Sequence, residues 1–239
     1  MNNKINLARG RALDLSEPII MGIVNVTPDS FSDGGQFFNI TAALKHAMQL
    51  LDDGATILDI GGESTRPGAP DVTLEDELQR VIPIIKAIRE QSDCVISIDT
   101  SKSEVMRQAI EAGADIVNDV RALQEPGALE VVAQYPDVVV CLMHMQGQPR
   151  SMQNDPHYND LASEINDFFN QRIAACETAG IRQSQLILDP GFGFGKTLKH
   201  NYQILSQFND FAQFGLPLLA GLSRKSMIGN LLNRDTKDR

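Results

Sequence analysis

Two patterns of apolar residues alternate along this chain. Short runs rich in valine, isoleucine and leucine are typical of buried strands, whereas apolar residues three and four positions apart indicate amphipathic helices. The clearest helical segments are residues 41–52, 74–90 and 161–179. The candidate strands are residues 19–24, 56–60, 95–98, 115–117, 138–143, 186–188 and 216–220.

Glycine follows helical segments at Gly54, Gly113 and Gly180. Glycine tolerates the left-handed conformation that ends a helix, so these residues mark predicted helix ends. Strands and helices that repeat at this spacing predict βα units around a parallel sheet. No linker or change in composition divides the chain, so we expect one α/β domain over residues 1–239. Seven units are visible, one fewer than a closed (β/α)8 TIM barrel requires.

The composition narrows the class of protein. Of the 239 residues, 42% are hydrophobic, which is enough for a single large core. A net charge of −10 argues against nucleic acid and anionic membranes as partners, because no basic stripe is available to neutralise phosphates. The first fifteen residues lack the apolar region of a signal peptide, so we expect none. No apolar run approaches the roughly 18 residues of a membrane span. Three widely spaced cysteines are typical of free thiols, so we expect a cytoplasmic protein.

Polar residues directly follow most candidate strands, where the chemistry of a parallel barrel gathers. Each could instead be a helix cap or a loop anchor. Together they suit a flat polar heterocycle, because a carboxylate accepts a pair of N–H groups while amide and ammonium groups donate to ring nitrogens and a carbonyl. These residues are Asn25, Asp59, Glu63, Asp99, Asn118, Asp119, Asp189 and the run Ser223-Arg224-Lys225-Ser226.

The glycine-rich run at residues 189–197 invites comparison with a nucleotide-binding loop, but its spacing is wrong. Pro190 stands where the phosphate loop needs its first glycine, and a dinucleotide fingerprint fails because its third glycine comes one residue early. We expect these glycines to let the backbone pass close to a flat ligand. His144 has no partner at metal-ligand spacing, so we expect a hydrogen-bonded histidine and no zinc site.

Two connections, residues 25–35 and 61–68, are long and rich in Gly, Pro, Ser and Thr. Long loops on a rigid barrel often carry function as lids, although plain surface mobility is the alternative. Arg66, between Thr65 and Pro67, is a suitable clamp for a phosphate group.

Seven stretches, in order from about residue 20 to the end, resemble the dihydropteroate synthase family. The first, second and sixth are specific enough to distinguish this family from other barrels. The stretches are residues 22–35 (GIVNVTPDSFSDGG), 59–68 (DIGGESTRPG), 97–102 (SIDTSK), 117–120 (VNDV), 142–145 (LMHM), 188–196 (LDPGFGFGK) and 221–226 (GLSRKS).

The resemblance implies that 6-hydroxymethyl-7,8-dihydropterin diphosphate condenses with p-aminobenzoate, giving dihydropteroate and diphosphate. It assigns catalytic roles to Asp99, Lys225 and Arg66, and a Mg2+ contact to Asn25. The implied pterin-binding residues are Asp99, Asn118, Met143, Asp189 and Lys225. The implied diphosphate contacts are Asn25, Thr65 and Arg66. The implied p-aminobenzoate site, which sulfonamides occupy in the family, comprises Phe31, Thr65, Pro67, Phe194 and Ser226. Similar enzymes are commonly homodimers.

The implied chemistry needs no protein nucleophile. Diphosphate is a good leaving group once Mg2+ and hydrogen-bond donors neutralise its charge. The electron-rich pterin can then stabilise a cation at its exocyclic methylene, where the neutral aromatic amine attacks. We expect Asp99 to stabilise that positive charge and the two long loops to exclude water.

The sequence departs from the family at its end. Similar enzymes continue with an eighth strand that brings an Arg-x-His pair to the diphosphate, whereas this sequence stops within its seventh unit. We therefore expect a truncated sequence rather than a natural short form. If the chain does end here, diphosphate binding and turnover should both be badly impaired. Two other functions stay open: a pterin-binding methyltransferase on a similar barrel, and a non-catalytic pterin-binding subunit.

Overall fold

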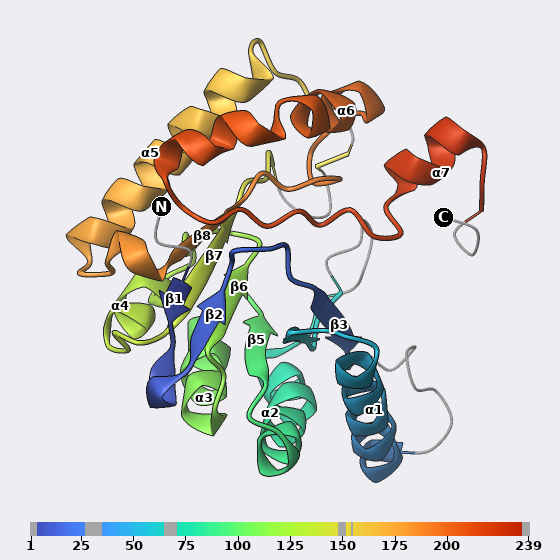
Figure 1. Cartoon of the computed structure of the whole chain (residues 1–239), viewed down its shortest axis with the longest axis vertical. Helices are drawn as coiled ribbons and strands as arrows, with labels where there is room; N and C mark the ends of the chain where they lie inside the picture. Colours follow the sequence, from blue (N-terminus) through green and yellow to red (C-terminus); the bar gives the residue numbers. More distant parts are fainter. Residues whose placement is uncertain (1–3, 27–34, 65–70, 148–151, 154, 236–239) are drawn as a thin grey trace.

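The computed structural model describes residues 4–26, 35–64, 71–147, 152–153 and 155–235. Its centre is a six-stranded parallel sheet in which each strand pairs with its predecessor along the chain. This order is that of a βα barrel, and it confirms the predicted fold class. The strands, shown in Figure 1, are β3 (Met21–Asn25), β4 (Ile57–Gly61), β5 (Val95–Asp99), β6 (Ile116–Asp119), β7 (Val139–Met143) and β8 (Leu186–Asp189).

Helices connect successive strands, and their ends have the expected signals. The side chains of Thr73 and Asp160 each accept a hydrogen bond at 3.1 Å from the backbone N–H three residues on, which caps the two longest predicted helices. Gly54, Gly113 and Gly180 have φ of 103°, 120° and 94°, so the predicted glycine helix ends are confirmed. The helices are α1 (Gly35–Asp52), α2 (Leu74–Gln91), α3 (Ser103–Ala112), α4 (Ala128–Ala133), α5 (Leu161–Thr178), α6 (Leu198–Ser206) and α7 (Ser226–Leu232).

The seventh predicted strand is reduced in the structure to a single parallel bridge. Leu218 pairs with Leu188 of β8, and the Leu219 N–H donates to the Leu188 carbonyl at 2.9 Å. Residues 216–220 therefore run beside β8 without forming a full strand. Within the described ranges, no strand of this sheet follows β8, and β3 pairs only with β4.

An N-terminal hairpin was not predicted from the sequence. Strands β1 (Lys4–Asn6) and β2 (Ala12–Asp14) pair antiparallel and lie across the sheet in Figure 1. The hairpin buries Ile5, Leu7 and Leu13 against residues at the starts of the sheet strands. It therefore fills the inner face of the barrel at the N-terminal ends of the strands. The strand residues in this inner cluster are Ile57, Val95, Ile116, Val139, Cys141 and Ile187.

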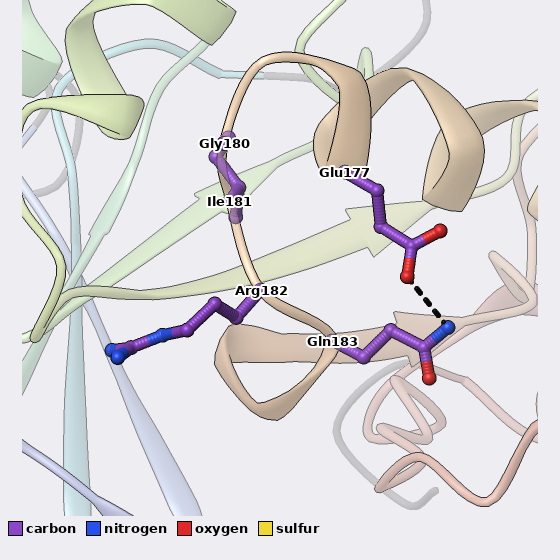
Figure 2. A pocket seen from close by; sticks show the side chains of 5 residues that line it. All are labelled: Glu177, Gly180, Ile181, Arg182 and Gln183. Atoms are coloured by element: carbon purple, nitrogen blue, oxygen red, sulfur yellow. Dashed lines mark hydrogen bonds between the residues drawn. The ribbon is translucent and has the colours of Figure 1, made fainter.

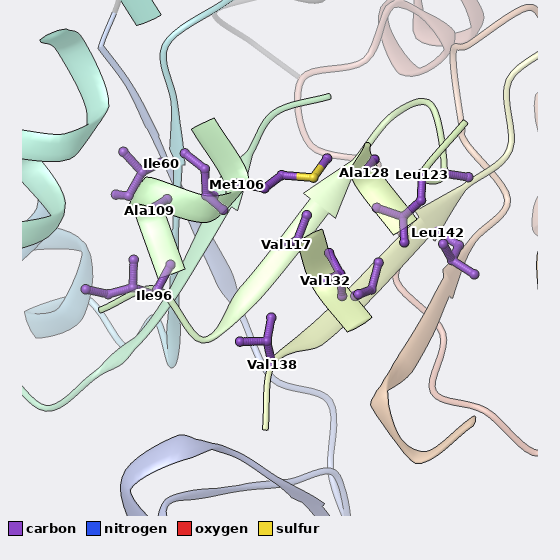
Figure 3. Packing of buried hydrophobic residues seen from close by; sticks show 14 of the residues in the cluster. Ile60, Ile96, Met106, Ala109, Val117, Leu123, Ala128, Val132, Val138 and Leu142 are labelled. Atoms are coloured by element: carbon purple, nitrogen blue, oxygen red, sulfur yellow. The ribbon is translucent and has the colours of Figure 1, made fainter. Parts of the chain in front are cut away.

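Alternation along each strand separates the inner face from a larger outer core. Ile96 and Ile98 of β5 are fully buried in the outer core. Figure 3 shows Ile96 in this core together with side chains from α3 and α4, such as Met106 and Val132. Ser97, the residue between them, is buried on the opposite face of the strand. The outer face of the sheet therefore packs against the helices, whereas its inner face carries buried polar side chains such as Ser97 and Asp59 in addition to the apolar cluster with the hairpin.

The cysteines are free thiols, in agreement with the sequence analysis. Cys141 and Cys176 are buried, whereas Cys94, which lies just before β5, is half-buried. No helix in the described part of the chain combines the length and the apolar character needed to cross a bilayer.

Candidate active site

Strand register brings three of the predicted residues to one level. Asn25 pairs with Gly61, Gly61 with Asp99, and Asp99 with Asn118, so these four residues form a row across β3 to β6. A side-chain carbon at Gly61 would lie 3.5 Å from Asn25 Oδ1 and 3.5 Å from Asp99 Oδ2. The absence of a side chain at Gly61 thus leaves a gap between an amide oxygen and a carboxylate at the carboxyl ends of the strands.

Asp59 lies next to this row, on the same face of β4 as Gly61 and two residues before it. It is one of the polar residues that follow candidate strands, and the sequence indicated no specific role for it. Its Oδ2 accepts a hydrogen bond from Asn118 Nδ2 at 3.1 Å. Within the described part of the chain, Asp59 Oδ1 and the hydroxyl of the neighbouring Ser97 are buried without a hydrogen-bond partner. Burial raises the pKa of Asp59, and the nearby Ser97 hydroxyl and the bond from Asn118 oppose this rise. Buried polar groups without protein partners normally bind water or a ligand.

Asp99 lies in an unusually negative environment. Burial and the nearby carboxylates raise its pKa well above the ordinary value, with Asp59 and Asp119 as the largest electrostatic contributors. The side chain is nevertheless only half-buried, because it projects from the open end of β5. A positive charge placed beside Asp99 would therefore relieve repulsion among several acids.

The opposite side of the site is formed by Asp189 at the end of β8. Its Oδ1 accepts the Gly191 N–H at 2.7 Å. Burial raises the pKa of Asp189 to about 6, against the opposing effects of that N–H and of Lys225 and Lys196. Met143 pairs with Asp189 in the sheet register and is buried beside it. The carboxylate is thus held in place with one oxygen engaged by the backbone.

Lys225 connects the two sides electrostatically. Burial lowers the pKa of its ammonium, while Asp189 and Asp99 raise it, so both carboxylates act on the same cation. The ammonium lies 4.3 Å from the centre of the Phe194 ring, within the range of a cation–π interaction. Ser226, the first residue of α7, is exposed next to it. The remaining predicted residues, Phe31, Thr65, Arg66 and Pro67, lie outside the described ranges.

Two of the acids that follow candidate strands prove to be structural. Asp119 accepts hydrogen bonds from Ser101 Oγ at 2.5 Å and from the backbone N–H groups of Arg121 and Leu123 at 2.8 and 2.7 Å. It therefore anchors the turn after β6, which is the loop-anchor alternative that the sequence left open for these polar residues. Glu63 forms an ion pair with Lys102.

The ion pair between Glu63 and Lys102 extends to a residue that sequence reasoning missed. Glu77 of α2 is fully buried, and its Oε2 lies 2.5 Å from the Lys102 ammonium. Its Oε1 accepts from the Thr100 hydroxyl at 2.6 Å. A buried glutamate within an amphipathic helix pattern gives no local signal, so only the fold identifies it.

A surface hollow in Figure 2 lies far from these residues. It is lined by the end of α5 and the residues before β8, and Gln183 Nε2 donates to Glu177 Oε1 there at 2.9 Å. Since β8 starts at Leu186 and ends at Asp189, this hollow is at the opposite end of the strand from the site. No three acidic, histidine or cysteine side chains in the described ranges are grouped as a metal site.

The chain belongs to the family of pterin-binding enzymes, which its residues 21–239 match. Its similarity to individual relatives narrows the family to one branch. Dihydropteroate synthase of Escherichia coli K12 is 56% identical over 232 residues, which cover 97% of this chain and 82% of that protein. This similarity places the chain among the dihydropteroate synthases.

Solved structures agree with this placement. A Yersinia pestis dihydropteroate synthase in complex with a sulfonamide drug superposes with a TM-score of 0.92 at 55% identity, covering 97% of this chain and 84% of that one. A Xanthomonas albilineans dihydropteroate synthase with 4-aminobenzoic acid gives a TM-score of 0.92 at 49% identity, covering 100% and 85%.

Proposed function

We propose that this chain condenses 6-hydroxymethyl-7,8-dihydropterin diphosphate with p-aminobenzoate to give 7,8-dihydropteroate and diphosphate. The main support is the row of Asn25, Asp99 and Asn118 across adjacent strands, with Asp189 and Lys225 on the other side. The similarity to dihydropteroate synthases over nearly the whole chain supports the same reaction.

The pterin ring is recognised by groups of complementary hydrogen-bonding character. Asp189 accepts the paired N–H groups of the 2-amino-4-oxo-pyrimidine edge, and Asn118 and Lys225 donate to its ring nitrogens and carbonyl. Met143, buried next to Asp189, packs against the ring. An analogue that lacks these polar atoms would leave buried partners unpaired, which gives the site its selectivity.

Bond breaking precedes bond formation in the proposed mechanism. The bond between the exocyclic methylene and the diphosphate oxygen breaks, and its electron pair leaves with diphosphate. The ring-stabilised cation forms next to Asp99, whose environment is already rich in negative charge. The amine lone pair of p-aminobenzoate then forms the C–N bond, and the amine proton passes to solvent. Thr65 and Arg66 contact the diphosphate in this proposal.

A Mg2+ ion fits the site as a partner of the diphosphate. Mg2+ prefers oxygen ligands and often uses one or two protein groups together with water and substrate phosphates. Asn25 Oδ1 is such an oxygen, and it borders the gap above Gly61. When bound, the ion would neutralise charge on the leaving diphosphate.

The p-aminobenzoate site lies on the side of Lys225 in this proposal. Phe194 and Ser226 border it, and Phe31, Thr65 and Pro67 from the two long loops complete it. Sulfonamides, which resemble p-aminobenzoate, would compete at the same place, as they bind the Yersinia pestis relative. We further propose that two copies of the chain form a homodimer, which sedimentation of the purified protein would test.

The decisive experiment is a condensation assay on the purified chain. Pterin diphosphate, p-aminobenzoate and Mg2+ should yield dihydropteroate and an equal amount of diphosphate at a measurable rate, even if diphosphate binds poorly to this chain. A sulfonamide should inhibit in competition with p-aminobenzoate. Product formation without a methyl donor would exclude a methyltransferase. Pterin binding by calorimetry with no condensation under any Mg2+ concentration would instead support a non-catalytic pterin-binding subunit.

A further inference from the structure

The loop between β8 and α6, residues 190–197, is held in place by an unusual set of side chains. Three successive backbone carbonyls accept from three different residues: Gly193 O from Gln153 at 2.5 Å, Phe194 O from Lys196 at 3.0 Å, and Gly195 O from Tyr158 at 2.8 Å. A loop whose carbonyls are individually satisfied has few alternative conformations. Phe194 is therefore presented from a firmly held segment.

Lys196 is the buried member of this set. Its side chain is almost completely enclosed, and its ammonium contacts His144 Nδ1 at 3.0 Å, the His144 carbonyl at 3.2 Å and the Phe194 carbonyl at 3.0 Å. An ammonium has three N–H donors, and these three acceptors match them. The contact with His144 confirms that this histidine is hydrogen-bonded. Burial lowers the pKa of Lys196 to about 7, with Asp189 opposing the shift.

The glycines around Lys196 explain how the loop reaches His144. A side-chain carbon at Gly191 would lie 2.0 Å from the His144 carbonyl, and one at Gly195 would lie 2.4 Å from the Gln146 carbonyl. Both glycines also have positive φ, of 72° and 59°. These two glycines therefore allow close approach to the backbone after β7, a role that the sequence did not predict.

Gly193 and Phe194, by contrast, line Lys225. A side-chain carbon at Gly193 would lie 3.3 Å from Lys225 Cδ, and the Phe194 ring lies under the Lys225 ammonium. The chain of contacts therefore runs from His144 through Lys196 to the Phe194 backbone, and from the Phe194 ring to Lys225. A shift of the loop would displace the ring from the cation.

We propose that Lys196 is a positioning residue, which acts through His144 and the Phe194 carbonyl to hold the Phe194 ring against Lys225 and so shapes the p-aminobenzoate side of the site. This inference rests on the proposed function, since it assigns the Phe194 ring to the second substrate. The proposal gives a role to Lys196, the one lysine of residues 189–197, whose spacing does not fit a nucleotide-binding loop.

A kinetic comparison tests the role. Lys196→Met keeps the unbranched stem of the side chain but removes the ammonium and its donors. Lys199→Met, at an exposed lysine on α6, is the matched control. Lys196→Met should raise the KM for p-aminobenzoate about tenfold, while the KM for pterin diphosphate and kcat change less than about threefold. Equal changes in both KM values, or a protein indistinguishable from wild type, would overturn the proposal.

Substitutions at His144 provide a second test if Lys196→Met does not fold. His144→Asn keeps an acceptor near the position of Nδ1 and should retain most of the wild-type KM for p-aminobenzoate. His144→Leu removes the acceptor and should reproduce the selective rise in that KM. If the two His144 variants behave alike, the bond to Lys196 does not position the site.

Fluorescence tests the inference without any activity, and so separates it from the proposed function. The chain contains no tryptophan, so Phe194→Trp creates a single reporter at the ring position. Adding Lys196→Met should increase quenching of that tryptophan by acrylamide at least twofold, whereas adding Lys199→Met should leave it unchanged. Equal quenching in all three proteins would refute the inference even if condensation is observed. A wild-type chain without condensation activity would instead contradict the proposed function.

Discussion

The two ends of the barrel differ in the surroundings of their buried carboxylates. At the N-terminal end, Asp115 is fully buried and forms ion pairs with Arg11 and with Arg89, the latter at 2.9 Å, and it accepts the Ile96 N–H at 3.0 Å. Arg9 lies at the edge of the same group, 4.0 Å from Asp115. Arg9 and Arg11 belong to the N-terminal hairpin segment, so this cluster also fastens that segment to the sheet.

At the carboxyl-terminal end, several of the described acids lie close enough to one another to raise the pKa of Asp99. Burial raises the pKa values of Asp59, Asp99 and Asp189, and Asp59 and Asp99 also repel each other. Lys225 is the cation on which both Asp99 and Asp189 act. Among the described residues, the buried charge of Asp115 at the N-terminal end is compensated by ion pairs. The carboxylates at the carboxyl-terminal end instead raise the pKa of Asp99 by repulsion, which is typical of a functional site.

The largest expected effect comes from breaking the compensated end. Asp115→Asn leaves Arg11 and Arg89 without their buried counterion, which should lower the free energy of unfolding by about 3–5 kcal/mol. Urea denaturation measures this loss, with Asp137→Asn at an exposed position as the control. A loss below about 1 kcal/mol would mean that the arginines are satisfied by backbone carbonyls alone.

An aspartate-to-asparagine substitution at the carboxyl-terminal end should instead reduce activity and leave stability almost unchanged. Asp99→Asn should lower kcat about a hundredfold, because it removes the charge proposed to stabilise the pterin cation. It should leave the free energy of unfolding unchanged or slightly increased, because a carboxylate repelled by its neighbours is removed. Kinetics and urea denaturation on one preparation measure both. Equal losses in kcat and in diphosphate affinity would argue against the proposed role.

A smaller effect concerns pH. Because the pKa of Asp189 is raised to about 6 in the folded protein, its ionised form is present above that pH and is lost as the pH falls through it. Only the ionised carboxylate accepts two N–H groups, so affinity for a pterin without diphosphate should fall about tenfold between pH 7.5 and 5. Calorimetry at several pH values measures the change. Asp189→Asn should bind weakly with no such step, and a step that persists in this variant would assign it to another group.

The smallest expected effect concerns Arg9. Its side chain is 46% exposed and lies as far as 4.0 Å from Asp115, so solvent screens the interaction. Arg9→Ala should therefore cost less than about 1 kcal/mol in the free energy of unfolding. Arg89→Ala, with its shorter contact, should cost clearly more. Equal losses in urea denaturation would show that the three arginines act as a single unit.

The local pattern of apolar residues was sufficient to predict the positions of most strands of the sheet. Six of the seven predicted strands appear within two residues of their expected bounds, because a buried parallel strand requires a continuous apolar run. The seventh, around Leu218, has such a run but forms only one bridge, since pairing depends on neighbours that are distant in sequence. The hairpin at β1 and β2 was missed because three-residue strands are too short to show a period.

By itself, the sequence determined which polar residues end the strands and, through the family resemblance, the reaction to test. Which of those residues share the site was decided only by tertiary structure, since adjacent residues of a strand point to opposite faces. Asn118 faces the barrel and meets Asp59, whereas Asp119 anchors a turn. The buried contacts of Glu77 and Lys196 likewise join segments that only folding brings together, because a hydrogen bond depends on distance in space and leaves no local pattern in the chain.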